Sequence, residues 1–250
     1  MMKLYLTSSH TLGWAGDLNP ANGFADSLSQ ALSGGPIRCV VVSSYPDDIE
    51  ITDRMAWEIR ECFDRANLPF EHYEVLDRRT AKYATRMFRN VNFVILCGGH
   101  VPTENKFFKQ INLKKKLAGF DGVLMGISAG SMNCAHRVYC PPELEGEAVN
   151  KKYINHLEGL GYTNLNILPH FQNARKDRID GVRLVDDIVL KDSFEHPVWC
   201  LNDGSFFLIE GERIELRGKA YKASNGKLKL VCHENERKLL MPGGMLRKIR

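Results

Sequence analysis

Short β-branched apolar segments alternate along this chain with longer segments of helical spacing, and no other feature restricts the fold as strongly. Strands are predicted at residues 3–8, 37–44, 70–76, 91–96 and 122–127. Helices are predicted at residues 22–32, 47–66, 80–89 and 103–117. Strands that alternate with helices form parallel sheets with helices on both faces. The pattern therefore predicts an α/β fold, with a mostly parallel sheet sandwiched by helices.

The pattern changes after residue 197. Short strand-like segments follow at residues 197–202, 205–210, 212–217 and 228–232. Turn signals such as Asn202-Asp203-Gly204 connect them, which is typical of antiparallel hairpins. Residues 197–250 are therefore predicted to form a small β-rich, antiparallel C-terminal extension. Because no linker-like stretch precedes it, residues 1–250 are expected to be a single domain.

Composition excludes several function classes. The chain has 34 Lys and Arg residues against 30 Asp and Glu, a balance that argues against a nucleic-acid partner or an acidic membrane surface. Its seven cysteines include no CxxC pair, so buried free thiols are expected rather than disulfides or a zinc site. The apolar stretch at the N-terminus is too short for a signal peptide, and no run approaches the ~18 apolar residues of a membrane span. We expect a cytoplasmic protein without metal or cofactor; a homodimer stays open.

The sharpest motif is Gly126-Ile127-Ser128-Ala129-Gly130, which matches G-x-S-x-G. A predicted strand precedes it and a helix is expected after it, as in a nucleophile elbow that presents a serine hydroxyl above a sheet. The alternative is a plain turn of small residues between a strand and a helix. The context favours Ser128 as a nucleophile.

A serine hydroxyl needs a base within reach, and His170 is the best candidate among eight histidines. It follows the short apolar run 166–169, which could end a strand beside the elbow, and the C-terminal ends of parallel strands share one edge. The alternative is a histidine that only caps a loop. His156 and His196 stay open as bases, and His100, after two glycines, is expected to line the site.

A carboxylate should orient the imidazole and stabilise its cation. Glu143, Glu145 and Glu147 lie between Ser128 and His170 in an acidic stretch. Spacing does not choose among them, and a solvated acidic loop is the usual meaning of such a run. Asp177 and Asp180 are weaker competitors.

Two further features concern the substrate. The backbone N–H of Ala129, with that of Gly98 or Gly99, is a candidate donor to a developing oxyanion. Arg175 and Arg178 are i, i+3 neighbours if a helix starts there, and paired guanidiniums could hold a substrate carboxylate. The alternative for the arginines is an ordinary solvated surface.

These residues resemble the peptidase E and cyanophycinase family of serine peptidases. The resemblance is carried by Cys97-Gly98-Gly99-His100, by the elbow, by Leu168-Pro169-His170-Phe171 and, more weakly, by Leu201-Asn202-Asp203-Gly204-Ser205. It implies a class I glutamine-amidotransferase-like fold, with Ser128 as nucleophile and His170 as base. It also implies oxyanion donors at Gly99 and Ala129. An ungapped reading from the elbow puts the family's acidic residue at Glu143.

The resulting hypothesis is a serine peptidase that cleaves small peptides through a Ser-His-Glu acyl-enzyme mechanism. The resemblance adds a preference for aspartyl residues. An α/β-hydrolase esterase shares the elbow and the order serine, acid, histidine, but Ser128 and His170 are close for that fold and no HGGG-type segment occurs. An inactive binding module of the same fold is the non-enzyme alternative.

Overall fold

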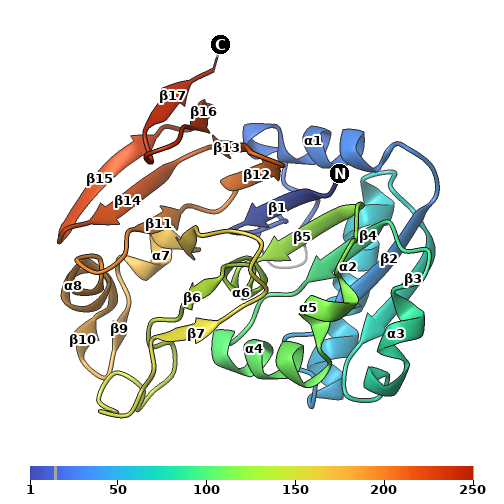
Figure 1. Ribbon diagram of the computed structural model, residues 1–250, viewed down its shortest axis with the longest axis horizontal. Coiled ribbons are helices and arrows are strands. Elements are labelled where there is room, and N and C mark those ends of the chain that lie inside the picture. Colours follow the sequence, from blue (N-terminus) through green and yellow to red (C-terminus); the bar gives the residue numbers. More distant parts are fainter. Residues whose placement is uncertain (14–15, 250) are drawn as a thin grey trace.

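The computed structural model describes residues 1–13 and 16–249, and a mixed sheet runs through its middle (Figure 1). The parallel half of the sheet consists of β1 (Lys3–Thr7), β2 (Ile37–Val42), β3 (Phe70–Leu76), β4 (Phe93–Leu96) and β5 (Val123–Ile127). The antiparallel half consists of β12 (Phe206–Glu210), β13 (Arg213–Arg217), β16 (Arg237–Leu240) and β17 (Leu246–Lys248). The strand order is β17-β16-β13-β12-β1-β5-β4-β2-β3.

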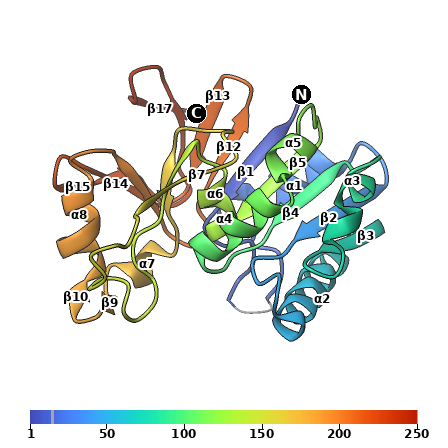
Figure 2. The ribbon, with the colours of Figure 1, turned by 60° about the horizontal axis from the view of Figure 1, so that its bottom comes forward.

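Each face of this sheet has its own apolar core, because successive strand side chains point to opposite faces. Leu4 and Leu6 of β1 pack into one core and Tyr5 into the other. The Tyr5 face is covered by α1 (Phe24–Leu32) and α2 (Ile49–Arg65). The Leu4 face is covered by α3 (Ala84–Met87), α4 (Val101–Gln110), α5 (Leu113–Lys116) and α6 (Ala129–Asn133) (Figure 2). The predicted α/β class, with a parallel sheet between helices, is confirmed.

Helix boundaries differ from the predictions where local caps decide them. The helix predicted at 47–66 begins at Ile49 as α2, because Asp48 is its N-cap: the Asp48 side chain accepts a hydrogen bond from the Ile51 N–H at 3.0 Å. The predicted helix at 103–117 is two helices, because Asn112 adopts a left-handed conformation with φ of 50°. The predicted helix at 80–89 is reduced to a short 3₁₀ turn, Ala81–Tyr83, followed by α3.

A second sheet has the order β15-β14-β11-β8. Its strands are β8 (Asn166–Leu168), β11 (Val198–Leu201), β14 (Ala220–Ser224) and β15 (Lys227–Cys232). β8 and β11 are parallel, and the other pairs are antiparallel. The strands of residues 197–250 therefore divide between two sheets rather than forming a hairpin unit of their own.

The remaining elements are short. They are the 3₁₀ turn Ala21–Gly23, β6 (Arg137–Tyr139) paired with β7 (His156–Glu158), α7 (Phe171–Ala174), β9 (Arg178–Ile179) paired with β10 (Val182–Arg183), the π-helical turn Leu184–Val189 and α8 (Leu190–Asp192). No helix of the described ranges is both long and apolar enough to span a membrane.

Candidate active site

The elbow at Ser128 joins β5 to α6 in a conformation that few residues tolerate. Ser128 has φ of 50° and ψ of −112°, a positive φ that is uncommon outside glycine and often marks functional strain. The two flanking positions must be glycine because a side chain would not fit there. A Cβ on Gly126 would lie 2.5 Å from the Ser131 nitrogen, and one on Gly130 would lie 2.3 Å from the Leu96 oxygen.

Two pairs of parallel strands bring the site together at their C-terminal ends. Thr7 of β1 is the register partner of Ile127 of β5, so Ser8 and Ser128 follow neighbouring strand ends. Leu168 of β8 is the register partner of Cys200 of β11, so the residues that follow these two strands are also neighbours. In both sheets, therefore, the residues that follow neighbouring parallel strands meet at the edge formed by the C-terminal strand ends.

His170 lies two residues past β8 and contacts Ser128 directly. Its Nε2 is 3.0 Å from the Ser128 Oγ. Its backbone N–H donates to the Ser8 Oγ at 2.7 Å, and its own φ is 51°. His170 is therefore held in place through its backbone N–H as well as through its ring.

The carboxylate on His170 is that of Asp203, which lies two residues past β11. The His170 Nδ1 is 2.7 Å from the Asp203 Oδ1, so the Nδ1 proton is donated to the carboxylate and Nε2 is left to accept the Ser128 hydroxyl proton. Ser8 donates to Oδ1 at 2.7 Å, and the Gln172 amide donates to Oδ2. Burial alone would raise the pKa of Asp203, but its hydrogen bond to His170, the His170 charge, and the Ser8 and Gln172 donors lower it.

The prediction of Glu143, Glu145 or Glu147 as the partner of His170 is corrected by this geometry. Glu147 accepts the backbone N–H groups of Glu143 and Leu144 and pairs with His100 at 3.0 Å. Glu145 is exposed. Glu143 faces the same cavity as Ser128 but is tied to the start of α4, where its carboxylate accepts the Val101 N–H. These residues lie in the loop between β6 and β7, whereas Asp203 follows β11, the parallel partner of β8.

Glu143 has an unusual acidity. Its pKa is raised to about 7. Burial is the largest cause and the Glu147 charge adds to it, whereas the Val101 N–H and the His170 charge lower the pKa. The carboxyl therefore holds its proton more strongly than an ordinary glutamate does. A perturbed titratable group in a cleft is a candidate for a functional role.

Gly98 and Gly99 run close beside the elbow. A Cβ on Gly98 would lie 3.0 Å from the Ser128 Cβ, and one on Gly99 would lie 2.7 Å from the Ser44 Oγ. Ser44 in turn donates to the Gly98 carbonyl at 2.6 Å. Gly99, in the loop between β4 and α4, lines the same cavity as Ser128, and Ala129 begins α6 directly after Ser128.

A cavity of about 250 Å³ lies beside Ser128 and His170. Its other lining residues are Gly99, Pro141, Pro142, Glu143, Leu168, Pro169, Ala174, Asp177, Ile179 and Leu184. The predicted substrate residues lie outside this lining. Arg175 stacks on the Phe171 ring at 5.9 Å, Arg178 donates to the Gly181 carbonyl at 3.2 Å, and His100 is paired with Glu147.

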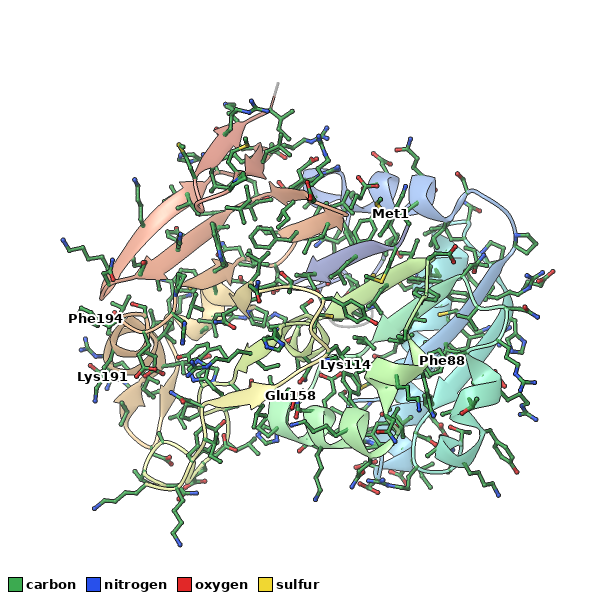
Figure 3. The ribbon with its side chains drawn as sticks, in the orientation of Figure 1. Met1, Phe88, Lys114, Glu158, Lys191 and Phe194 are labelled. Carbon is green, nitrogen blue, oxygen red and sulfur yellow. The ribbon has the colours of Figure 1, made fainter. Side chains whose placement is uncertain are left out.

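A larger cavity of about 550 Å³ lies elsewhere, between α4, α5 and the turn after β7. Lys114 and Glu158, labelled in Figure 3, line it, and their Nζ and Oε1 atoms are 4.0 Å apart. Its lining residues include no serine and no histidine. Within residues 1–13 and 16–249, no three His, Cys, Asp or Glu side chains cluster so that they could hold a metal ion.

Comparisons with known proteins point to peptidases. The model of peptidase family S51 matches residues 52–217. A solved peptidase from an acI-B1 actinobacterium has a TM-score of 0.64 and 15% identity, covering 100% of this chain and 97% of that one. A solved protein described as a putative peptidase E from Listeria monocytogenes EGD-e has a TM-score of 0.57 and 17% identity, covering 86% and 96%. At such identities the two structures show likeness of fold alone. No curated protein matches the chain.

Proposed function

The chain belongs to peptidase family S51 and is a serine-type peptidase, and from this premise we propose that Ser128 is its nucleophile, His170 its general base and Asp203 the carboxylate that orients His170. The observation that carries the proposal is the continuous chain of contacts from the Ser128 Oγ through the imidazole to the Asp203 Oδ1, at 3.0 Å and 2.7 Å. Both distances are within the reach that proton transfer requires.

The reaction follows from these positions. Ser128 attacks the substrate carbonyl carbon while His170 Nε2 takes the hydroxyl proton, and the oxyanion is stabilised by the N–H groups of Gly99 and Ala129. His170 then gives the proton to the leaving amine as the C–N bond breaks. Water repeats the sequence on the acyl-enzyme: His170 takes its proton and returns it to Ser128. Asp203 stays ionised throughout, in keeping with its lowered pKa.

The cavity supports a small peptide as the substrate. Its volume of about 250 Å³ lies below the ~300–1,000 Å³ typical of ligand pockets, so it suits one residue beside the scissile bond. The aspartyl preference implied by the family resemblance calls for a cation near that residue. Among the described residues that line the cavity there is no lysine and no arginine, so this preference is not part of the proposal.

Substitution of the two competing carboxylates tests the assignment. The rate of phosphonylation by a neutral fluorophosphonate measures nucleophile activation even though the natural substrate is unidentified. Asp203→Asn should lower this rate by about 10³-fold or more, since loss of the orienting carboxylate costs several powers of ten in such triads. Glu143→Gln should lower it far less, and exposed Glu145→Gln serves as the matched control. A larger loss in Glu143→Gln than in Asp203→Asn would overturn the assignment of Asp203.

A further inference from the structure

The cavity beside Ser128 carries negative charge on its walls. Its ionisable lining residues are Glu143, His170 and Asp177. The others are apolar side chains, proline, glycine and the nucleophile itself. Apart from His170, two carboxylates therefore face this space, and the described lining contains no lysine or arginine to balance them.

Glu143 is fixed in place by backbone contacts. Its carboxylate accepts the N–H of Val101, two residues after Gly99, and its own N–H donates to the Glu147 Oε2 at 2.8 Å. The carboxylate is thus held close to the segment expected to bind the oxyanion. Its neighbour Glu147 adds negative charge, and the pKa of Glu143 is raised to about 7, first by burial. A cationic ligand bound beside this carboxylate would stabilise its ionised form.

Asp177 adds a second carboxylate from a different segment, just after α7. Its backbone is anchored, because the Leu184 N–H donates to its carbonyl at 3.0 Å. In the part of the chain that the structure describes, its side chain has no hydrogen-bond or ion-pair partner. The Asp177 side chain is exposed and lines the rim of the cavity, where it can meet a ligand.

The basic residues beside Asp177 in the sequence, Arg175, Lys176 and Arg178, are not among the residues that line the cavity. Arg175 lies over the Phe171 ring, and Arg178 donates to Gly181. Arg183 forms ion pairs with Asp187 at 2.6 Å and with Asp186 at 3.1 Å. The described lining thus holds Glu143 and Asp177 without a lysine or arginine, so a carboxylate in the cavity would meet like charge, which is costly at short range.

We propose that this cavity selects peptides that place a positively charged group beside the scissile carbonyl, through Glu143 and Asp177. The proposal rests on the proposed function and adds its substrate class. An ammonium or guanidinium group can have two sources here. It is either the α-ammonium of an N-terminal residue, which lies next to the first carbonyl, or the side chain of a lysine or arginine at the cleaved residue.

Hydrolysis of paired aminomethylcoumarin amides separates these sources. Alanine amide against acetyl-alanine amide tests the α-ammonium, and acetyl-lysine amide against acetyl-norleucine amide tests the side chain at matched size. Preference for the cationic member of either pair, in the value of kcat/KM, supports the proposal and identifies the source. In the double variant Glu143→Gln/Asp177→Asn that preference should fall by about tenfold or more, whereas Glu145→Gln, an exposed glutamate of the same loop, should keep it.

Two results would overturn the proposal. One is a wild-type preference for acetyl-aspartate amide over acetyl-norleucine amide. The other is an equal preference in wild type and double variant. Labelling of Ser128 by a neutral fluorophosphonate is measured in parallel on every variant. Labelling without charge preference removes this inference alone, whereas wild-type protein that is not labelled at Ser128 removes the proposed function and this inference with it.

Discussion

Ser8 shows how much of the site depends on single atoms. Its hydroxyl donates to the Asp203 Oδ1 and accepts the His170 N–H, both at 2.7 Å. It thereby joins the end of β1 to the ends of β8 and β11. No motif marks this serine in the sequence, where it reads as part of the first strand. Only the pairing of β1 with β5 brings it to the site.

The acidity of Glu143 makes a prediction about stability. Its folded pKa of about 7 exceeds the ordinary value of 4.5, so the folded protein binds more protons than the unfolded chain between these pH values. The titration of Glu143 therefore lowers the free energy of unfolding as pH rises from about 4.5 to 7, and its effect is constant at higher pH. The glutamine in the variant Glu143→Gln does not titrate, so the free energy of unfolding of the variant should rise relative to that of the wild type across that window, by at most about 3 to 4 kcal/mol.

Urea unfolding of both proteins at several pH values between 4 and 8 measures this difference. Most other groups titrate alike in both proteins, so their effects cancel when the two free energies of unfolding are subtracted. The variant Glu145→Gln controls for removal of a loop charge. A wild-type-to-variant difference that stays constant over the whole range would show that Glu143 has an ordinary pKa.

At the scale of elements, the sequence predicts the positions of strands better than it predicts which strands pair with one another. The β-branched runs of β2, β4 and β5 fall within a few residues of the predicted ranges, because burial on both faces forces continuous apolar residues. The same logic leads to Ser128 and His170, since both follow apolar strands. It does not lead to Asp203, whose Asn202-Asp203-Gly204 segment reads as a hairpin turn. The pattern predicts an antiparallel extension there, whereas β11 runs parallel to β8 and delivers Asp203 to the same edge.

Close packing of the elbow predicts strict size limits in the G-x-S-x-G segment. A Cβ on Gly130 would lie 2.3 Å from the Leu96 oxygen and 2.7 Å from the Cys97 oxygen. Backbone atoms cannot move aside cheaply, so Gly130→Ala should destabilise the protein by about 3 kcal/mol or more. Gly34→Ala is the matched control, because its Cβ would meet nothing within 4 Å. Thermal unfolding of the two variants tests this limit, and equal melting temperatures would contradict it.

At the scale of the whole molecule, the site depends on two sheets meeting. Ser128 comes from the central sheet, and His170 and Asp203 come from the ends of strands in the second sheet. β8 and β11 belong to a separate sheet, and Figure 1 shows β11 beside the end of β1 rather than within the central sheet. Long-range placement of this kind is not encoded in any local pattern, which is why the sequence leaves the carboxylate on His170 undecided.

Dense packing of the whole fold predicts inert thiols. All seven cysteines are free and buried, and burial raises the pKa of each thiol. Native protein should therefore resist iodoacetamide at pH 8, and urea-unfolded protein should take up one label per cysteine. Mass spectrometry counts the labels. Rapid modification of a thiol in the native state would contradict this dense packing and would identify a second candidate nucleophile.

The most direct test of the central claim is to locate the residue that a fluorophosphonate modifies. Peptide mapping by mass spectrometry after reaction of the native protein should find a single adduct, on Ser128. The adduct should be absent in Ser128→Ala and should form far more slowly in His170→Ala. An adduct on another residue, or equal modification of wild type and Ser128→Ala, would contradict the assignment of Ser128 as the nucleophile.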